Sequence, residues 1–211
     1  MISTMKRNNI ELITAFLDEQ YPNVGCELLY NKDHELVIAV MLSAQTTDIS
    51  VNKVTPVLFS KYPNLESLAN AQLSDVEDII HSIGLYKNKA KNVIAIAQAL
   101  INDYGGVLPS GKDELQKLPG VGNKTAGVIR CEVFKIPDLP VDTHILRISK
   151  RLNLAKPDDD AYETEMKLKK VFSKDRWIKT HHQLIHFGRY ICLARNPQCE
   201  KCKLSGICNK K

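Results

Sequence analysis

Four cysteines lie close together near the end of this 211-residue chain, in the spacing Cys192-x6-Cys199-x2-Cys202-x5-Cys208. Zinc sites usually pair two short Cys-x2-Cys knuckles that lie a dozen or more residues apart, whereas here a single knuckle is flanked by wider, unequal gaps. Four thiolates without a histidine are the usual ligands of a 4Fe-4S cluster. The spacing therefore predicts that this region folds around an iron–sulfur centre, with a zinc ion and then disulfides as the weaker alternatives.

The composition limits where such a chain works and what it binds. No signal peptide is expected, because the apolar stretch from Ile10 to Leu17 is interrupted by Glu11. The longest apolar run, Leu36 to Leu42, is too short to span a bilayer and predicts a buried helix or strand. We expect a cytoplasmic protein that is neither secreted nor membrane-bound. The net charge of +5 favours a polyanionic partner.

Apolar residues recur at helical spacing along the chain, and no alternating strand pattern is found. The segments with this spacing are Ile10, Ile13, Phe16 and Leu17; Val76, Ile79, Ile80 and Ile83; and Ile94, Ala97, Leu100 and Ile101. Turn signals such as Gly105-Gly106 separate them. The pattern predicts an all-α protein, with Ile136 to Pro140 as the crossing between two lobes. Without a heptad pattern, we expect a monomer.

A glycine-rich turn interrupts the helical pattern at Leu118 to Ala126, which reads LPGVGNKTA. Its two glycines, Gly120 and Gly122, permit a tight turn in which several backbone N–H groups point outward and bind a phosphate oxygen. A P-loop is excluded, because that motif needs a longer loop with Lys followed by Ser or Thr directly after its second glycine. A simple connector between two helices is the alternative.

Two residues suggest catalysis, one at the end of this segment and one farther along the chain. Lys124 lies in the first turn of the expected second helix, where the positive end of the helix dipole disfavours a lysine. An ordinary lysine has a pKa of about 10.4, so a nucleophilic lysine needs desolvation or a base; the alternative is a point-charge contact to phosphate. Asp142 precedes another helix and suits an N-cap. Near Lys124 it would instead accept a proton or stabilise cationic character on a sugar.

Together these motifs resemble those of endonuclease III, a DNA glycosylase and abasic-site lyase of base excision repair. The resemblance spans nearly the whole chain, in one order, and the cysteine spacing is the family's own. It includes Leu36 to Asp48, Ile83 to Tyr86 with Lys89-Ala90, Leu118 to Ala126, Val141 to Arg147, His186 to Tyr190 and the four terminal cysteines.

The resemblance implies an all-α, two-lobed helix-hairpin-helix DNA glycosylase fold with DNA across the cleft between the lobes. A six-helix lobe would span residues 26–136. Residues 1–25 and 137–211 would form the lobe that holds the 4Fe-4S cluster. The partner would be double-stranded DNA containing damaged pyrimidines or abasic sites, and the protein would be nucleoid-associated.

The resemblance also assigns roles to residues of this chain. Lys124 matches the nucleophile and Asp142 the catalytic carboxylate, while Cys192, Cys199, Cys202 and Cys208 match the cluster ligands. Gln45 and Leu85 match residues that occupy the space left by a flipped base. Further DNA contacts are expected from Leu118, Gly120, Gly122, Thr125, His144, Arg147 and Arg195.

Some residues depart from the family pattern or lack a role. Asn123 occupies a position that is often basic in the family, so one phosphate contact is in doubt. Cys26 and Cys131 are expected to be buried apolar residues. The remaining histidines of interest are expected to be hydrogen-bonded scaffold, and these are His181, His182 and His186.

Three alternatives share parts of this pattern. An adenine-mismatch glycosylase would normally lack the lysine and carry an additional C-terminal domain. A pyrimidine-dimer glycosylase of the same fold would keep both Lys124 and Asp142. A non-catalytic DNA-binding module would use the hairpin and the cluster only to hold the duplex. The presence of both Lys124 and Asp142 favours an enzyme.

Overall fold

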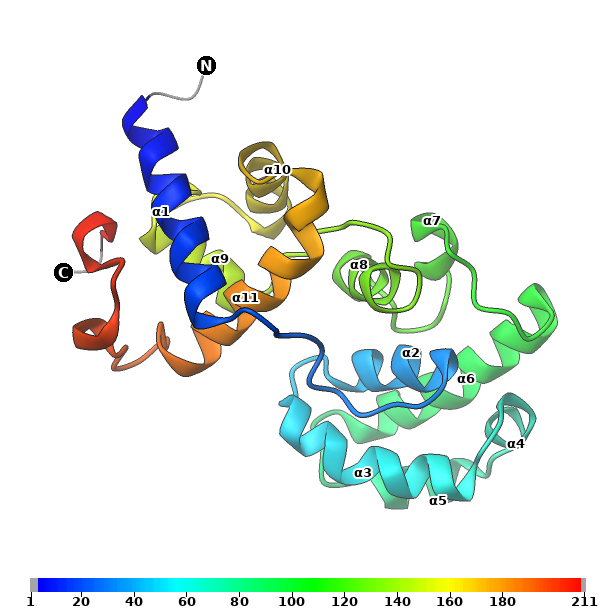
Figure 1. Ribbon diagram of the computed structural model, residues 1–211. Coiled ribbons are helices and arrows are strands. Elements are labelled where there is room, and N and C mark those ends of the chain that lie inside the picture. The colour runs from blue at the N-terminus through cyan, green and yellow to red at the C-terminus, as the bar shows by residue number, and fades with distance from the viewer. Residues whose placement is uncertain (1–3, 210–211) are drawn as a thin grey trace. The chain divides into compact units, whose positions relative to one another are not determined.

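The computed structural model describes residues 4–209, and all regular secondary structure in this range is helical, as the sequence predicted. Figure 1 shows the helices in chain order. The chain forms two compact units. One unit combines the N-terminal segment ending at Cys26 with the segment that begins at Pro137, and the other runs from Glu27 to Ile136. Among the described residues, no helix is long and apolar enough to cross a membrane.

The continuous unit is built around a helix that is buried on all sides. Within α2, every residue from Leu36 to Leu42 is at most 6% exposed, so the apolar run is a core helix and not a strand. The helices of this unit are α2 (Asp33–Leu42), α3 (Asp48–Lys61), α4 (Leu65–Ala69), α5 (Leu73–Ile80), α6 (Tyr86–Tyr104), α7 (Lys112–Leu115) and α8 (Asn123–Glu132).

The discontinuous unit packs the first helix of the chain against helices from its end. Ile13, Phe16 and Leu17 bury one face of α1, and the ring of Phe16 meets that of Phe187 edge to face at 5.2 Å. The elements of this unit are α1 (Thr4–Gln20), α9 (Thr143–Arg151), α10 (Ala161–Val171), η1 (Lys174–Arg176), α11 (Trp177–Tyr190), η2 (Cys199–Lys201) and η3 (Ser205–Ile207).

Close packing of α9 on α11 depends on Gly188. A Cβ atom at this position would lie 2.8 Å from His144 Cβ and 3.0 Å from Ile148 Cδ1. Glycine therefore lets the two helices approach at the level of His144, two residues after Asp142.

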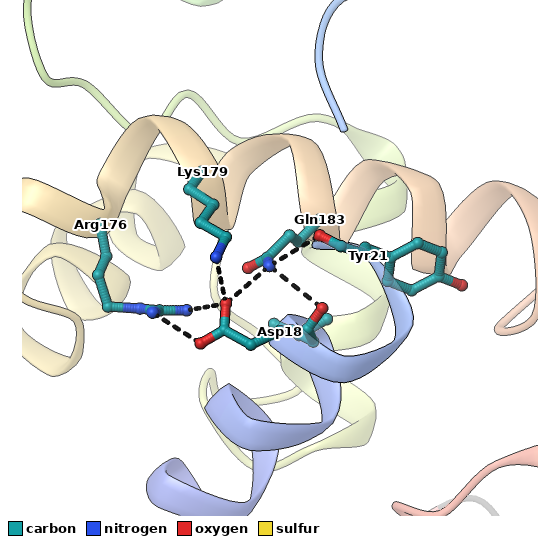
Figure 2. A network of polar contacts seen from close by, with 6 residues as sticks. Asp18, Tyr21, Arg176, Lys179 and Gln183 are labelled. Carbon is teal, nitrogen blue, oxygen red and sulfur yellow. Dashed lines mark hydrogen bonds and ion pairs between the residues drawn. The ribbon is translucent and has the colours of Figure 1, made fainter. Parts of the chain in front are cut away.

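A polar network around Asp18 joins α1 to the segment containing η1 and α11 (Figure 2). Arg176 binds both carboxylate oxygens, at 2.9 and 3.2 Å, and Lys179 Nζ lies 2.8 Å from Oδ1. Gln183 donates to Asp18 Oδ1 and to the carbonyls of Leu17 and Tyr21, which end α1. The hydrogen bonds from Arg176 hold the pKa of the Asp18 carboxyl well below its usual range.

We expect Asp18→Asn to lower the free energy of unfolding at pH 7 by about 1 kcal/mol, because the site is partly exposed to solvent. The native pKa of Asp18 is depressed, so its contribution is complete above the unfolded-state pKa of about 4 and is lost as the pH falls below it. Urea unfolding across pH should therefore show the gap between wild type and variant closing in acid. Glu11→Gln, at an exposed ion pair on the same helix, should change stability little.

Candidate functional site

The glycine hairpin connects α7 to α8 as the sequence predicted. Val121 N donates to Leu118 O at 3.0 Å, and Gly120 has φ of 76°, a conformation that favours glycine. A Cβ atom at Gly120 would lie 2.6 Å from Asn92 Nδ2 and 3.0 Å from Met41 Cγ. The turn is therefore packed directly on α6 and α2, and glycine is required there for both conformation and space.

The N-terminus of α8 presents donors and a primary amine at the same place. The first intrahelical bond runs from Ala126 N to Gly122 O, so the N–H groups of residues 123–125 precede the hydrogen-bonded ladder. Gly122 at the N-cap supplies no side chain to cap them. Asn123 and Lys124 are exposed, and Thr125 is half-buried. These N–H groups, with the helix dipole, make an anion site beside the Lys124 amine.

Gln45 and Leu85 share an unusual backbone conformation. Both are in the left-handed region, with φ of 55° for Gln45 and 60° for Leu85, which costs a non-glycine residue about 1–3 kcal/mol. Leu85 is the N-cap of α6 and its side chain is 59% exposed, while Gln45 lies exposed in the turn between α2 and α3. Leu85 makes no side-chain capping bond and is not packed in the core.

Asp142 caps α9, as the sequence predicted. Its Oδ1 accepts a hydrogen bond from Ile145 N at 2.8 Å, and the side chain is half-buried. In the described part of the chain, Oδ2 makes no hydrogen bond. One oxygen therefore fixes the carboxylate on the helix end, and the other is not used in capping.

Buried charge holds the segment that leads to Asp142. The Lys169 ammonium lies 2.5 Å from both Asp138 Oδ1 and Glu165 Oε1, whose side chains are 3% exposed. His181 Nδ1 is 2.9 Å from Pro140 O. Although burial acts in the opposite direction, the bonds to the two carboxylates raise the pKa of Lys169. Asp142 therefore follows a segment that is anchored by α10 and α11.

Arg147 and Arg151 from α9 bind carbonyls at the end of α11. Arg147 Nη2 donates to Gly188 O and Cys192 O, both at 2.9 Å. Arg151 Nη1 donates to Leu193 O at 2.8 Å and lies 3.1 Å from Cys192 Sγ. Burial lowers the pKa of Arg147 from its usual value. The structure thus commits the Arg147 guanidinium, expected to contact DNA, to the start of the cysteine-rich segment.

The four terminal cysteines line one pocket. Its wall also includes Phe187, Leu152 and Ile191, so the thiols face an apolar hollow beside the Arg151 guanidinium. Within residues 4–209, no group of three or more His, Cys, Asp or Glu side chains is arranged to hold a single metal ion. Burial and then the neighbouring cysteines raise the pKa of the Cys202 thiol. A set of thiolate donors around an apolar pocket fits a bulky iron–sulfur group.

The two units divide the expected site residues between them. The hairpin, Lys124, Gln45 and Leu85 belong to the continuous unit, whereas Asp142, His144, Arg147, Arg195 and the four cysteines belong to the discontinuous one. Leu118, expected to contact DNA, is 2% exposed and packs in the core. Cys131 is buried as expected, and Cys26 is half-buried. His181 and His182 are buried as well.

The sequence did not reveal the residues that hold the segment before Asp142 and the start of the cysteine segment. Asp138, Lys169 and Arg151 act through partners that lie 31 to 42 positions away, as in the bond from Arg151 to Leu193 O. No local spacing signals such a pairing. Lys89 was noted only as part of a motif, although it is 4% exposed.

A glycine hairpin between two helices of an all-α chain defines the helix-hairpin-helix class of DNA-binding proteins. Residues 38–174 match the family described as HhH-GPD superfamily base excision DNA repair protein. The chain is 45% identical to endonuclease III of Bacillus subtilis (strain 168), over 95% of this chain and 92% of that protein. It is 38% identical to endonuclease III of Escherichia coli (strain K12), over 98% and 97%.

Solved structures agree with these relatives. A non-covalent endonuclease III–DNA complex matches with a TM-score of 0.94 and 44% identity, over 99% of this chain and 96% of that one. A trapped covalent endonuclease III–DNA intermediate matches with a TM-score of 0.90 and 46% identity, over 95% of each chain. The chain belongs to the HhH-GPD superfamily of base excision DNA repair proteins and, within it, to the endonuclease III family.

The hairpin glycines give a direct test of the packing at this site. We expect Gly120→Ala to lower the free energy of unfolding by about 1–3 kcal/mol, because alanine is strained at this φ and meets Asn92 and Met41. Gly122→Ala is the matched control, since a Cβ there has nothing within 4 Å, and it should stay within about 0.5 kcal/mol of wild type. Equal losses in the two variants, measured by urea unfolding, would contradict the packing argument.

Proposed function

We propose that Lys124 is the nucleophile and Asp142 the partner carboxylate of the reaction on damaged DNA. The chain is a DNA glycosylase and abasic-site lyase of base excision repair, as its family and its likeness to the trapped endonuclease III–DNA intermediate show. The observation that carries the residue assignment is the exposed Lys124 amine directly after the hairpin, at a helix end that suits a phosphate and not a lysine.

Base removal begins when the damaged nucleotide leaves the stack, which costs least for a poorly stacked base. The Lys124 amine, having lost a proton, attacks C1′ of the deoxyribose, and the bond from C1′ to the base breaks with its electron pair leaving on the base. In this proposal the oxygen of Asp142 that does not bind Ile145 N accepts a proton and stabilises positive charge on the sugar. The attached nitrogen then gives up a proton and its lone pair expels O4′ from C1′. The C1′–O4′ bond breaks, O4′ takes a proton, and the product is an imine between Lys124 and the opened sugar.

Strand cleavage follows from the same imine. The imine acidifies the proton on C2′, and loss of this proton expels the 3′ phosphate by β-elimination. Water then hydrolyses the imine and returns the free amine. Only an amine nucleophile permits this step, because hydrolysis of the base by activated water leaves no imine.

The DNA backbone is held, in this proposal, by the N–H groups at the start of α8 and by exposed basic residues of the cysteine segment. Arg195 is exposed, whereas Lys203 is paired with Glu19 of α1. Gln45 and Leu85 would fill the space left by the extruded base, and His144 would lie near the sugar. The substrate class we propose is oxidised pyrimidines in chromosomal DNA, so the enzyme would act in the cytoplasm at the nucleoid.

We expect sodium borohydride, added during turnover on an abasic-site duplex, to trap a covalent protein–DNA adduct by reducing the imine. Lys124→Ala should abolish the adduct and lower strand cleavage by at least about 10³-fold while the protein still binds the duplex. The control is Lys117→Ala, which removes an exposed lysine from the other side of the hairpin and should keep the adduct.

An undiminished adduct in Lys124→Ala would refute the assignment. The same assay on thymine-glycol, dihydrouracil and pyrimidine-dimer duplexes decides the substrate class. Activity confined to the dimer duplex would replace oxidised pyrimidines with the alternative considered from the sequence.

A 4Fe-4S cluster held by Cys192, Cys199, Cys202 and Cys208 is the second part of the proposal. The four thiols line one apolar pocket, and Arg151 places a positive charge beside Cys192 Sγ. When bound, such a cluster would organise the segment that carries Arg195, because neither base removal nor β-elimination transfers an electron. Arg147 and Arg151 hold the backbone of the first cysteine and of the next residue at the end of α11.

We expect the purified protein to be brown, with absorbance near about 400 nm and iron with acid-labile sulfide. Cys202→Ser should remove most of the colour and iron, whereas Cys26→Ser, a half-buried cysteine outside the pocket, should keep both. If the wild-type protein contains zinc and no acid-labile sulfide, the four cysteines bind zinc instead of a cluster.

A further inference from the structure

Lys89 is a buried cation without a counter-charge. The residue is 4% exposed, and its Nζ donates to Thr46 Oγ1 at 2.7 Å. No carboxylate pairs with it among residues 4–209. Burial lowers the pKa of Lys89 from its usual value, which is the direction expected for an ammonium removed from water. None of the steps of the reaction uses this amine.

An ammonium buried against a single hydroxyl destabilises a fold. Charges removed from water are costly unless they are paired, and apolar residues of similar volume are often neutral or stabilising in their place. A methionine would fill the same space at position 89 without this cost. Residues that work against stability are expected where function requires them.

The position of Lys89 on α6 shows what it connects. Leu85, Lys89 and Asn92 are four and three residues apart, so they follow one side of the helix. Leu85 starts α6 and its carbonyl accepts from Lys89 N at 3.0 Å. Asn92 lies against the hairpin at Gly120, where an added Cβ would come within 2.6 Å of its Nδ2. Lys89 reaches from the same side to Thr46, the residue after Gln45.

This side of α6 therefore contacts three segments that we propose to face DNA: the Gln45 turn, the start of α6 at Leu85 and the hairpin at Gly120. Gln45 and Leu85 both have positive φ, and neither turn is fixed by a side-chain cap: α6 has none, and the turn at Gln45 is closed by the backbone bond from Thr46 N to Ser43 O. The bond from Lys89 Nζ to Thr46 Oγ1 is a direct side-chain link between the two segments.

We propose that Lys89 is a positioning residue, which ties the Gln45 turn to the start of α6 so that Gln45 and Leu85 enter the duplex as a pair. The inference rests on the proposed role of these two residues in filling the space of an extruded base. Its consequence is selective: Lys89 matters for removing a base from an intact stack and much less for cleaving a site that has already lost its base.

The test is Lys89→Met, with Lys91→Met as the matched control. Lys91 is exposed on the same helix, so both variants lose one positive charge. At saturating enzyme we expect Lys89→Met to slow single-turnover removal of thymine glycol about tenfold. The reason is that Gln45 and Leu85 are then no longer held in fixed positions relative to each other. Cleavage of a preformed abasic site should stay within about twofold of wild type, since such a site has no base to unstack.

Two further readouts separate positioning from general damage to the fold. The thermal midpoint of Lys89→Met should equal or exceed that of wild type, because a buried charge has been removed. The fluorescence rise of 2-aminopurine placed next to the lesion, which reports unstacking, should be lost in Lys89→Met and kept in Lys91→Met. Thr46→Val, which removes the acceptor, should reproduce the defect, and the double variant should be no worse than either single one.

Each remaining outcome overturns the inference. Equal losses in base removal and abasic-site cleavage would make Lys89 a general structural residue. Normal base removal in Lys89→Met or Thr46→Val would remove its role altogether. Failure of the proposed function itself is recognised separately, because the wild type would then neither remove the base nor cleave the abasic site.

Discussion

Two guanidinium groups at the end of α9 hold the carbonyls that end α11, and much of the discontinuous unit depends on this arrangement. The same short helix starts with Asp142 and ends with Arg151, which reaches the first cysteine. Gly188 permits the close approach that brings these groups together. One short helix, α9, therefore positions both the carboxylate of Asp142 and the pocket of thiols. Its nine residues span only about 14 Å.

The continuous unit differs, because the side chains proposed to enter the duplex are exposed on its surface. Gln45 and Leu85 are held in left-handed conformations, and Gly120 is packed where a side chain has no room. These features reduce stability, and the buried apolar run Leu36 to Leu42 of α2 offsets them. Strain of this kind, at exposed positions, is typical of surfaces built for binding.

Local signals explain which parts of the fold and site could be predicted from the sequence. Helical periodicity predicted the all-α class, and the N-cap at Asp142 and the hairpin at Gly120 each depend on residues within three positions. Contacts across long stretches of chain could not be predicted. Arg147 was expected to contact DNA, and its hydrogen bond to the carbonyl of Cys192, 45 residues away, could not be foreseen from local spacing. The burial of Lys89 could not be predicted either, because its acceptor Thr46 lies 43 positions away in another segment.

The discontinuous unit also sets an order of events on the ribosome. Domains form as their chain emerges, starting from the N-terminal end. Residues 27–136 are complete long before Arg176 and Gln183 are translated, although their partner Asp18 precedes all of these residues in the chain. The apolar face of α1 therefore stays uncovered while more than 150 further residues are synthesised, since Asp18 and Arg176 are 158 positions apart. During that interval Ile13, Phe16 and Leu17 lack the residues of α9 and α11 that cover them in the folded unit, and exposed apolar surface of this kind is prone to aggregation.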